Sequence, residues 1–560
     1  MEAMLVLLGL VVLAIPVCVI YLLVAHSGLR QRVVDLETDI ARLMAAQSET
    51  PSAQSASEPE VTEKPADAQA PPEQEAKRPA QPAKVSEPAA ARVIAARKAA
   101  EPQNTGPNRA QIVFSWLATN WFYVVSALSL ALAGLFLVQY GVENDLFPPV
   151  ARVLAALGFG AALIGAGEVI RRRYGDGPDS ATAYIPSVFS GAGLVSLFGA
   201  IAAARLLYDL IGVEAAFAGM AAVGLLGVAL GWLHGPLLGT VGVVGAFAAP
   251  LLVGSTVPAT NWLYLYFGII TALGLGVDTL RRWAWVSALS VALGFGMGWL
   301  TFSGGGASLT FGFQMFVLGL VALAILIPAR SLWPDHDGQL IVGWAIKPKG
   351  PRPGFPTALA GAAVAAASFA LIWTSDPQID AFWSGIAGLV VLAVVLALWS
   401  LSAPALQDLA GLPAIGAVFV VAVEGQLGGP VLRAFQATYA ETPEADFPIA
   451  VTVLWAIGLG LSAVAAGRAL RPGYGVLWAM GAAILAPAMA IALEVTWQPA
   501  AVIGAYPWAL HAMAMAAIMV AFALRFAQVD GADKTRASLF VLSAIASVSF
   551  ALVLILSLAA

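Results

Sequence analysis

The sequence predicts an all-α integral membrane protein with about 16 transmembrane helices. Of its 560 residues, 60% are hydrophobic and 11% are charged, and the mean hydropathy is +0.84, far outside the range of soluble domains. A bilayer core about 30 Å thick requires roughly 20 apolar residues per helix. Runs of about this length, bounded by charges, prolines or glycine clusters, are residues 4–25, 119–140, 150–170, 184–204, 213–232, 236–254, 261–277, 283–302, 309–328, 357–373, 381–401, 409–424, 447–466, 474–494, 506–524 and 538–558.

The first span belongs to a predicted N-terminal anchor, residues 1–28. This segment has no basic region before its apolar run, carries Glu2 instead, and is followed by Arg30 and Arg32. It is also too long for the core of a secretory signal. We therefore expect a retained transmembrane helix whose N-terminus lies outside the cytoplasm.

Residues 29–46 have a different pattern, in which apolar side chains recur at alternating spacings of four and three. The pattern predicts either a short coiled coil or an amphipathic helix that lies on the membrane. A coiled coil would connect the chain to a second copy or to an envelope protein partner. The apolar positions are Leu29, Val33, Leu36, Ile40 and Leu43.

Residues 47–110 are rich in Pro, Ala, Glu, Gln and Ser and contain few large apolar residues. Such a composition cannot bury enough surface to fold, so we expect a disordered linker. The rest of the chain, residues 111–560, is the predicted polytopic membrane domain. The composition implies the lipid bilayer as a partner, and we expect no nucleic-acid partner.

The orientation follows from the distribution of basic residues, because Lys and Arg concentrate in cytoplasmic loops. With the N-terminus outside and sixteen crossings, residues 26–115 are cytoplasmic and the C-terminus lies outside. Beyond residue 115, the cytoplasmic loops then hold fourteen basic residues, Arg171, Arg172, Arg173, Arg281, Arg282, Arg330, Lys347, Lys349, Arg352, Arg468, Arg471, Arg525, Lys534 and Arg536. The opposite loops hold three, Arg152, Arg205 and Arg433.

The sequence contains few residues with catalytic potential. Cys18 is the single cysteine, and the four histidines lie in separate segments without metal-ligand spacing. "PDHDG" at 334–338 is interpreted as a polar turn, with a cation site as the alternative. We predict no catalytic residue, no metal and no cofactor, and the sequence favours a protein that is not an enzyme.

Ionisable residues near the apolar spans are better candidates, because a charge at the bilayer centre is costly. Glu168 precedes three arginines, which predicts an interfacial ion pair with Arg171 or Arg172. Other charges lie near the predicted outer face, where they form either a polar vestibule or dispersed interfacial anchors. The vestibule candidates are Arg152, Arg205, Asp209, Glu214, Glu424, Arg433 and Glu494.

Glycine and proline interrupt two apolar runs in similar ways. "GAFAAPLL" at 245–252 contains Gly245 and Pro250, and "GAAILAPAM" at 481–489 contains Pro487. Both are predicted helix breaks near the outer ends of their spans. In addition, Gly227 and Gly231 have the small-xxx-small spacing that allows helix backbones to approach closely.

Matching proline, arginine and tryptophan residues occur in the same order in the two halves of the chain. They suggest two parallel repeats of seven helices, spans two to eight and ten to sixteen. Chance similarity among Ala- and Gly-rich helices is the alternative. The pairs are Pro186 with Pro413, Arg205 with Arg433, Pro236 with Pro472, Pro250 with Pro487, Trp262 with Trp508, and Arg282 with Arg536.

Three stretches resemble one bacterial family. "NWFYVVSALSLALAGLFLVQYGVENDLFPPVARVLAALGFGAALIGAGEVIRRR" at 120–173, "GTVGVVGAFAAPLLVGS" at 239–255 and "YLYFGIITALGLGVDTLRRWAWVSALS" at 264–290 are similar to the predicted membrane proteins called domain of unknown function 2339. The positions that carry the resemblance are Asn120 and Trp121, Arg152, Gly167 and Glu168, residues 205–208, and residues 245–250. The resemblance implies the bacterial inner membrane and brings no activity.

Three classes of function remain. A transporter, exporter or flippase of an envelope-related or small-molecule substrate accounts for the size, the repeats and the prolines, and we favour it. A scaffold for cell-envelope assembly accounts for the coil and the linker. A membrane-embedded transferase is third, because no paired carboxylates or nucleophile with a base share a loop.

Overall fold

The computed structural model describes residues 148–174, 185–254, 259–281, 283–330, 333–346, 352–375, 378–441 and 448–557, together with three helical positions, 126, 129 and 133. The chain divides into two compact units, Met1–Ser126 and Ala127–Ala560, and the helices below belong to the second. The predicted anchor, coil and linker, and almost all of the second predicted span with Asn120 and Trp121, lie outside the described residues.

Within the described residues the second unit consists of helices and contains no strand. The long helices are α4 (Pro149–Tyr174), α5 (Ile185–Leu206), α6 (Val213–His234), α7 (Pro236–Val253), α8 (Trp262–Arg281), α9 (Ala284–Gly305), α10 (Thr310–Ala329), α12 (Phe355–Trp373), α13 (Ile379–Trp399), α14 (Gly411–Leu427), α16 (Ile449–Ala469), α17 (Gly475–Trp497), α19 (Ala505–Asp530) and α20 (Thr535–Ser557). Short helices are η1 (Gly306–Leu309), α11 (Ile341–Ile346), η2 (Pro404–Leu406), α15 (Pro430–Glu441) and α18 (Pro499–Ile503).

A helix lies at each predicted span from the third onward. Eleven segments of the described chain are long and apolar enough to cross a membrane, and one of them, Ala284–Ala329, combines α9 and α10 across η1. Two shorter apolar helices lie at Leu238–Val253 and Trp262–Val277. The total of sixteen crossings remains a prediction.

The region between Arg205 and Val213 forms the end of one helix and the start of another. Asp209 adopts a left-handed backbone conformation, with φ 47°, which a right-handed helix cannot continue through. The sequence is therefore divided here between α5 and α6, not bent within one helix.

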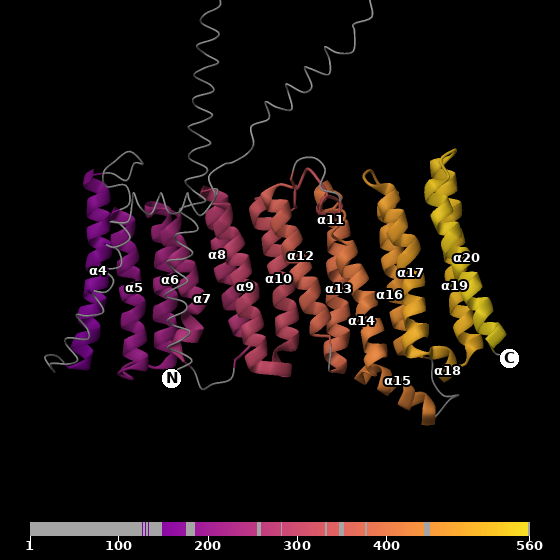
Figure 1. Ribbon diagram of the computed structural model, residues 1–560, viewed down its shortest axis with the longest axis horizontal. Helices are drawn as coiled ribbons and strands as arrows, with labels where there is room; N and C mark the ends of the chain where they lie inside the picture. Colours follow the sequence, from indigo (N-terminus) through magenta and orange to yellow (C-terminus); the bar gives the residue numbers. More distant parts are fainter. Residues whose placement is uncertain are drawn as a thin grey trace, which may run out of the picture. The chain divides into compact units, whose positions relative to one another are not determined.

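The helices pack mainly against neighbours in the chain. The most extensive contacts are those of α4 with α5, α6 with α7, α16 with α17, and α19 with α20, and Figure 1 shows these helices side by side in chain order. Non-consecutive helices that are in contact also lie only a few helices apart in the chain, as in α5 with α7, α14 with α17, and α17 with α20.

Glycines on two facing surfaces bring α6 and α7 together, as the spacing of Gly227 and Gly231 predicted. A Cβ atom built on Gly227 would lie 2.6 Å from the Cα atom of Gly242, and one on Gly231 would lie 2.6 Å from the Cα atom of Gly239. Van der Waals contacts between helix backbones supply much of the attraction in a bilayer, where the lipid is as apolar as the side chains. The prediction of a close helix pair is confirmed.

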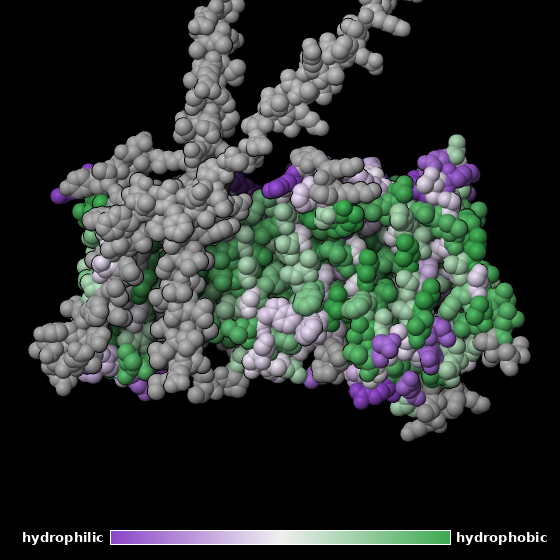
Figure 2. All heavy atoms as spheres, in the orientation of Figure 1, coloured by the Kyte–Doolittle hydropathy of each residue, from purple (hydrophilic) through white to green (hydrophobic). Residues whose placement is uncertain are grey.

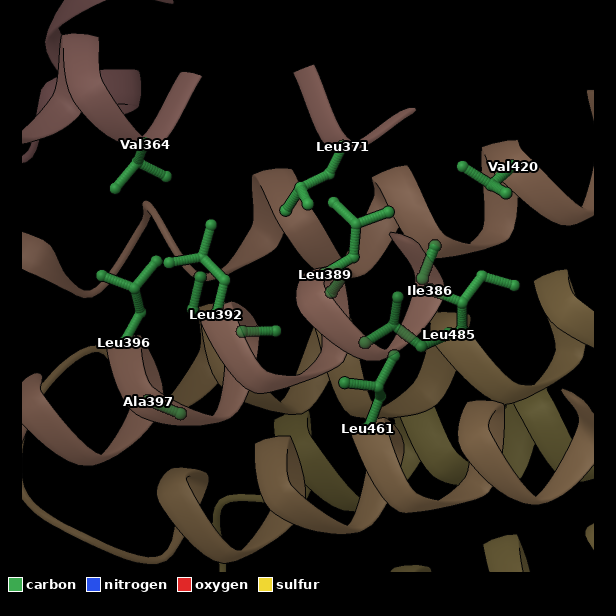
Figure 3. Packing of buried hydrophobic residues seen from close by; sticks show 14 of the residues in the cluster. Val364, Leu371, Ile386, Leu389, Leu392, Leu396, Ala397, Val420, Leu461 and Leu485 are labelled. Carbon is green, nitrogen blue, oxygen red and sulfur yellow. The ribbon is translucent and has the colours of Figure 1, made fainter. Parts of the chain in front are cut away.

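Most of the buried side chains in the C-terminal half are apolar. Figure 3 shows Leu389, Leu392 and Leu396 of α13 between side chains of neighbouring helices, among them Leu371 of α12 and Leu461 of α16. The same cluster contains much alanine, which lets these helices approach closely. Packing of this kind fixes the helices that carry the polar groups described next.

Candidate functional site

Pro250 lies inside α7, and its missing N–H leaves the carbonyl of Ala246, four residues earlier, without a helix partner. Tyr266 of α8 replaces that partner, since its hydroxyl donates a hydrogen bond of 2.7 Å to the Ala246 carbonyl oxygen. Gly245 faces the ring of Phe198 in α5, where a Cβ would overlap it. The helix was predicted to break at Gly245 and Pro250, but α7 continues through both residues, and a side chain from the next helix satisfies the carbonyl that the proline leaves free.

Replacing Tyr266 by phenylalanine should destabilise the protein by about 0.5–1.5 kcal/mol, because the Ala246 carbonyl then loses its one replacement donor. The measurement is the midpoint of thermal unfolding in detergent. Tyr506→Phe is the matched control, because Tyr506 is an exposed tyrosine near the start of α19. Equal midpoints for the two variants would contradict the assigned role of Tyr266.

Pro487 lies inside α17, and the helix continues past it to Trp497, as α7 continues past Pro250 to Val253. The N–H of Ala486, the residue before it, donates to the hydroxyl oxygen of Ser462 in α16 at 3.0 Å. A hydroxyl group of another helix lies beside each proline, but Tyr266 donates to the carbonyl that Pro250 leaves unpaired, whereas Ser462 accepts from the N–H of Ala486. Helices α7 and α17 are not among the packed pairs of the described chain, so Pro250 and Pro487 belong to separate surroundings.

Glu424, a vestibule candidate, is buried at 4% exposure near the end of α14. One of its carboxylate oxygens accepts hydrogen bonds from the backbone N–H groups of Val431 at 2.7 Å and Leu432 at 3.2 Å. These N–H groups open α15 and have no partner within that helix. The carboxylate therefore caps α15, where the helix dipole also favours a negative charge.

Two further carboxylates hold short helices in the same manner. Glu494 of α17 accepts from the N–H of Ala500 in α18, at 3.4 Å. Asp408, which the sequence analysis did not select, accepts from the N–H groups of Val342 and Gly343 in α11, at 2.6 and 3.1 Å. For Glu424 and Glu494 a signal existed in the sequence, because a proline at the first position of a helix follows six and five residues later. No signal in the sequence pointed to Asp408, because 66 residues separate it from its partner Val342.

The remaining vestibule candidates fall into two places in the fold. Arg205 forms an ion pair with Asp209, as their spacing of four allows, and Arg152 and Glu214 lie in the first turns of α4 and α6. Arg433 lies on the exposed face of α15. Helices α4 to α6 form no packed pair with α14 to α18 within the described residues.

Glu168 pairs with both arginines named in the sequence analysis. Its carboxylate accepts hydrogen bonds from Arg171 at 2.7 and 2.8 Å and from Arg172 at 2.7 Å. The predicted ion pair of Glu168 is confirmed, and its place at the membrane interface stays a prediction. His234, at the end of α6, places its Nε2 atom 3.5 Å from the same carboxylate, a partner that sequence reasoning missed because the two residues lie on different helices.

Arg468 is the most deeply buried arginine of the described chain, at 5% exposure. Its guanidinium donates to the Ser400 hydroxyl at 2.8 Å, to the Ser400 carbonyl at 3.0 Å and to the Pro472 carbonyl at 2.8 Å. The ring of Trp478 lies 5.7 Å from its central carbon, within cation–π range. The arginine thus connects the end of α13 to the turn between α16 and α17.

The segment at 334–338 contains a buried histidine. The Nε2 atom of His336 lies 3.1 Å from the Ile325 carbonyl oxygen, and its Nδ1 atom lies 3.4 Å from the Thr357 hydroxyl. The turn is therefore packed against α10 and α12. Among the described residues no group of three or more His, Cys, Asp or Glu side chains is arranged to hold a metal ion.

Two apolar grooves run along α20. One, of about 400 Å³, lies between α17 and α20 and is lined by Met480, Ala483, Ile484, Pro487, Ala488, Ile491, Leu539, Leu542, Ser543 and Ala546. The other, of about 620 Å³, lies between α19 and α20. Several side chains that line the two grooves are exposed, such as Leu542 at 63% and Ile545 at 57%. The grooves therefore open to the outside along the sides of the helices.

The helices, the carboxylate-capped short elements and the apolar grooves can be compared with known proteins. No curated protein and no solved structure matches the chain. The model of a family described as predicted membrane proteins matches residues 118–560. Because this match covers well over half of the chain, the protein belongs to that family of predicted membrane proteins, domain of unknown function 2339.

Proposed function

We propose that this membrane protein binds and moves an amphipathic substrate dissolved in the bilayer, of the class of lipids and lipid-linked envelope precursors. The observation that carries the proposal is the groove between α17 and α20, because Pro487, a proline inside α17, lies in its wall. A proline inside a helix beside a binding groove is a site where the helix can bend during transport.

The chemistry of the groove favours this substrate class over a hydrophilic solute. Its lining is apolar except for Ser543. A sugar or an ion in this groove would leave its polar groups without hydrogen-bond partners, at a cost of several kcal/mol. Hydrocarbon chains have no such cost, and a groove that opens sideways admits them directly from the bilayer.

The proposed setting is the bacterial inner membrane, with sixteen crossings and both termini outside the cytoplasm. The outer-face charges take a secondary place in this proposal. Glu424 and Glu494 hold α15 and α18 in position, whereas Arg152, Arg205 with Asp209, Glu214 and Arg433 remain candidates for contacts with substrate headgroups.

The test is lipid movement in liposomes that contain the purified full-length protein. A fluorescent phospholipid on the inner leaflet is scored by its exposure to a membrane-impermeant quencher. We expect Ala546→Phe to slow this movement, because a ring in the groove costs about 1–3 kcal/mol of overpacking, or roughly five- to 150-fold in rate. Ala546 is exposed, so the ring can be accommodated without loss of the fold.

Val553→Phe is the matched control, because Val553 is exposed on the same helix and lines neither groove. It should leave the rate unchanged. Liposomes with the intact protein that move lipid no faster than protein-free liposomes would exclude this function. The scaffold for envelope assembly, which depends on residues 29–46 and 47–110, would then be preferred.

A further inference from the structure

The second groove of α20 follows the antiparallel pair of α19 and α20. Its lining residues recur every three or four positions on both helices, which places them on two facing stripes. They are Val520, Ala523, Leu524 and Ala527 of α19, and Lys534, Ala537, Ser538, Val541, Ala544, Ile545, Val548 and Ser549 of α20 and the turn before it. Lys534 is the only charged residue among them.

The groove has a floor of small residues between ridges of larger ones. Ala523, Ala537 and Ala544 are buried at its base, whereas Leu524 and Ile545 stand exposed at its sides. From Lys534 to Ser549 the chain rises about 22 Å, at about 1.5 Å per residue. Half of a bilayer core is about 15 Å, so the groove is long enough for one lipid acyl chain and the start of its headgroup.

The charge at the head of the groove has no counter-ion of its own within the described residues. Asp530 is engaged by Arg536, whose Nε atom lies 2.9 Å from one carboxylate oxygen. Asp533 accepts hydrogen bonds from the hydroxyl and the N–H of Thr535, at 2.6 and 3.0 Å. No described carboxylate forms an ion pair with Lys534.

The position of Lys534 suits a headgroup. It lies in the turn between α19 and α20, on the face that the distribution of Lys and Arg assigns to the cytoplasm. Figure 2 shows hydrophilic residues gathered at this end of the helix pair and hydrophobic residues along its length. Anionic lipids attract basic side chains at the cytoplasmic surface.

We propose that the groove between α19 and α20 binds an anionic phospholipid of the cytoplasmic leaflet, with an acyl chain over the alanine floor and the phosphate at Lys534. The ammonium group supplies a point charge with three donors, which suits a phosphate oxygen. The exposed Ser538, one turn into α20, is a second polar group near the head of the groove. That the bound lipid is a substrate to be moved rests on the proposed function.

Binding is tested by native mass spectrometry of the full-length protein, titrated separately with phosphatidylglycerol and with phosphatidylcholine of the same chains. We expect tighter binding of the anionic lipid to the intact protein. Lys534→Gln should reduce that preference about fivefold, the factor that corresponds to about 1 kcal/mol for one basic residue at the membrane surface. Ala527→Leu, which narrows the groove, should weaken binding of both lipids.

Arg525→Gln is the control, because Arg525 is exposed on α19 but does not line the groove. Equal losses for Lys534→Gln and Arg525→Gln would overturn the proposal in favour of general surface charge. Equal affinities of the intact protein for both lipids would overturn it as well, as would competition by glycerol 3-phosphate, which lacks the acyl chains. Selective binding without lipid movement in liposomes would refute the proposed function and leave this site intact.

Discussion

Replacing Gly242 by alanine or valine should separate α6 from α7 and lower the amount of folded protein. A Cβ at this position would lie 2.5 Å from the backbone nitrogen of Val228, 2.6 Å from the carbonyl carbon of Gly227 and 2.7 Å from the carbonyl oxygen of Gly224. All three are backbone atoms, so no side-chain rotation relieves the overlap. We expect a loss of about 1–3 kcal/mol for alanine and more for valine, measured as thermal midpoint and yield in detergent.

Gly239 provides a matched control on the same helix face. A Cβ on Gly239 would meet only the Cα atom of Gly231, at 3.7 Å, which is ordinary contact. Gly239→Ala should therefore be neutral or stabilise the protein by up to about 1 kcal/mol, because alanine is the better helix former. If Gly242→Ala were tolerated as well as Gly239→Ala, the close approach of α6 and α7 would be wrong.

Loss of Arg468 should have an effect of similar size. Arg468→Ala removes three hydrogen bonds and leaves the carbonyls of Ser400 and Pro472 without this donor, which we expect to cost about 2–4 kcal/mol. Arg468→Lys should restore only part of the stability, because an ammonium group lacks the planar fork that reaches both carbonyls.

Arg471 is the control for this pair of variants, since it lies three residues later, in the turn after α16, and is exposed. Arg471→Ala should change the free energy of unfolding by no more than about 0.5 kcal/mol, so its thermal midpoint should stay close to that of the unchanged protein. Equal effects of Arg468→Ala and Arg471→Ala would mean that charge at this end of α16, and not the buried contacts, determines stability.

The packing supports the proposed repeats, because equivalent pairs of helices are in contact in both halves. If α5, α7 and α9 correspond to α14, α17 and α20, then the pairs α5 with α7 and α7 with α9 have counterparts in α14 with α17 and α17 with α20, and all four pairs are packed. The paired residues agree less well. Trp262 and Trp508 both lie in the first turn of a helix, yet Trp262 is 52% exposed and Trp508 is 1% exposed. Two parallel repeats therefore remain a proposal, tested by superposing the two sets of helices.

Much of the fold could be predicted because hydropathy acts locally. A run of about 20 apolar residues forms a helix in a bilayer whatever its neighbours are, since each backbone group must be bonded within the segment. The predicted spans from 150–170 to 538–558 accordingly coincide with helices. Helices α11, α15 and α18 could not be predicted from hydropathy, because these short helices depend on carboxylates from other elements.

For the candidate residues, contacts within one helix could be predicted from the sequence, whereas contacts between helices could not. Glu168 with its arginines and Arg205 with Asp209 could be paired from the sequence, because partners three or four residues apart lie on one face of a helix. His234 could not be added to Glu168, nor Ser400 to Arg468, because helix packing brings those partners together from 66 and 68 residues away.

The sequence alone determined that the protein has many apolar helices, where they lie, and that Gly227 and Gly231 allow a close approach of another helix, since each of these follows from composition and spacing within a segment. Only the tertiary structure decided that Tyr266 satisfies the carbonyl that Pro250 leaves free, that Glu424 caps α15, and that α20 forms a wall of two grooves. These features require two helices to be adjacent and correctly rotated, and that is a property of packing, which a one-dimensional pattern of hydropathy does not contain.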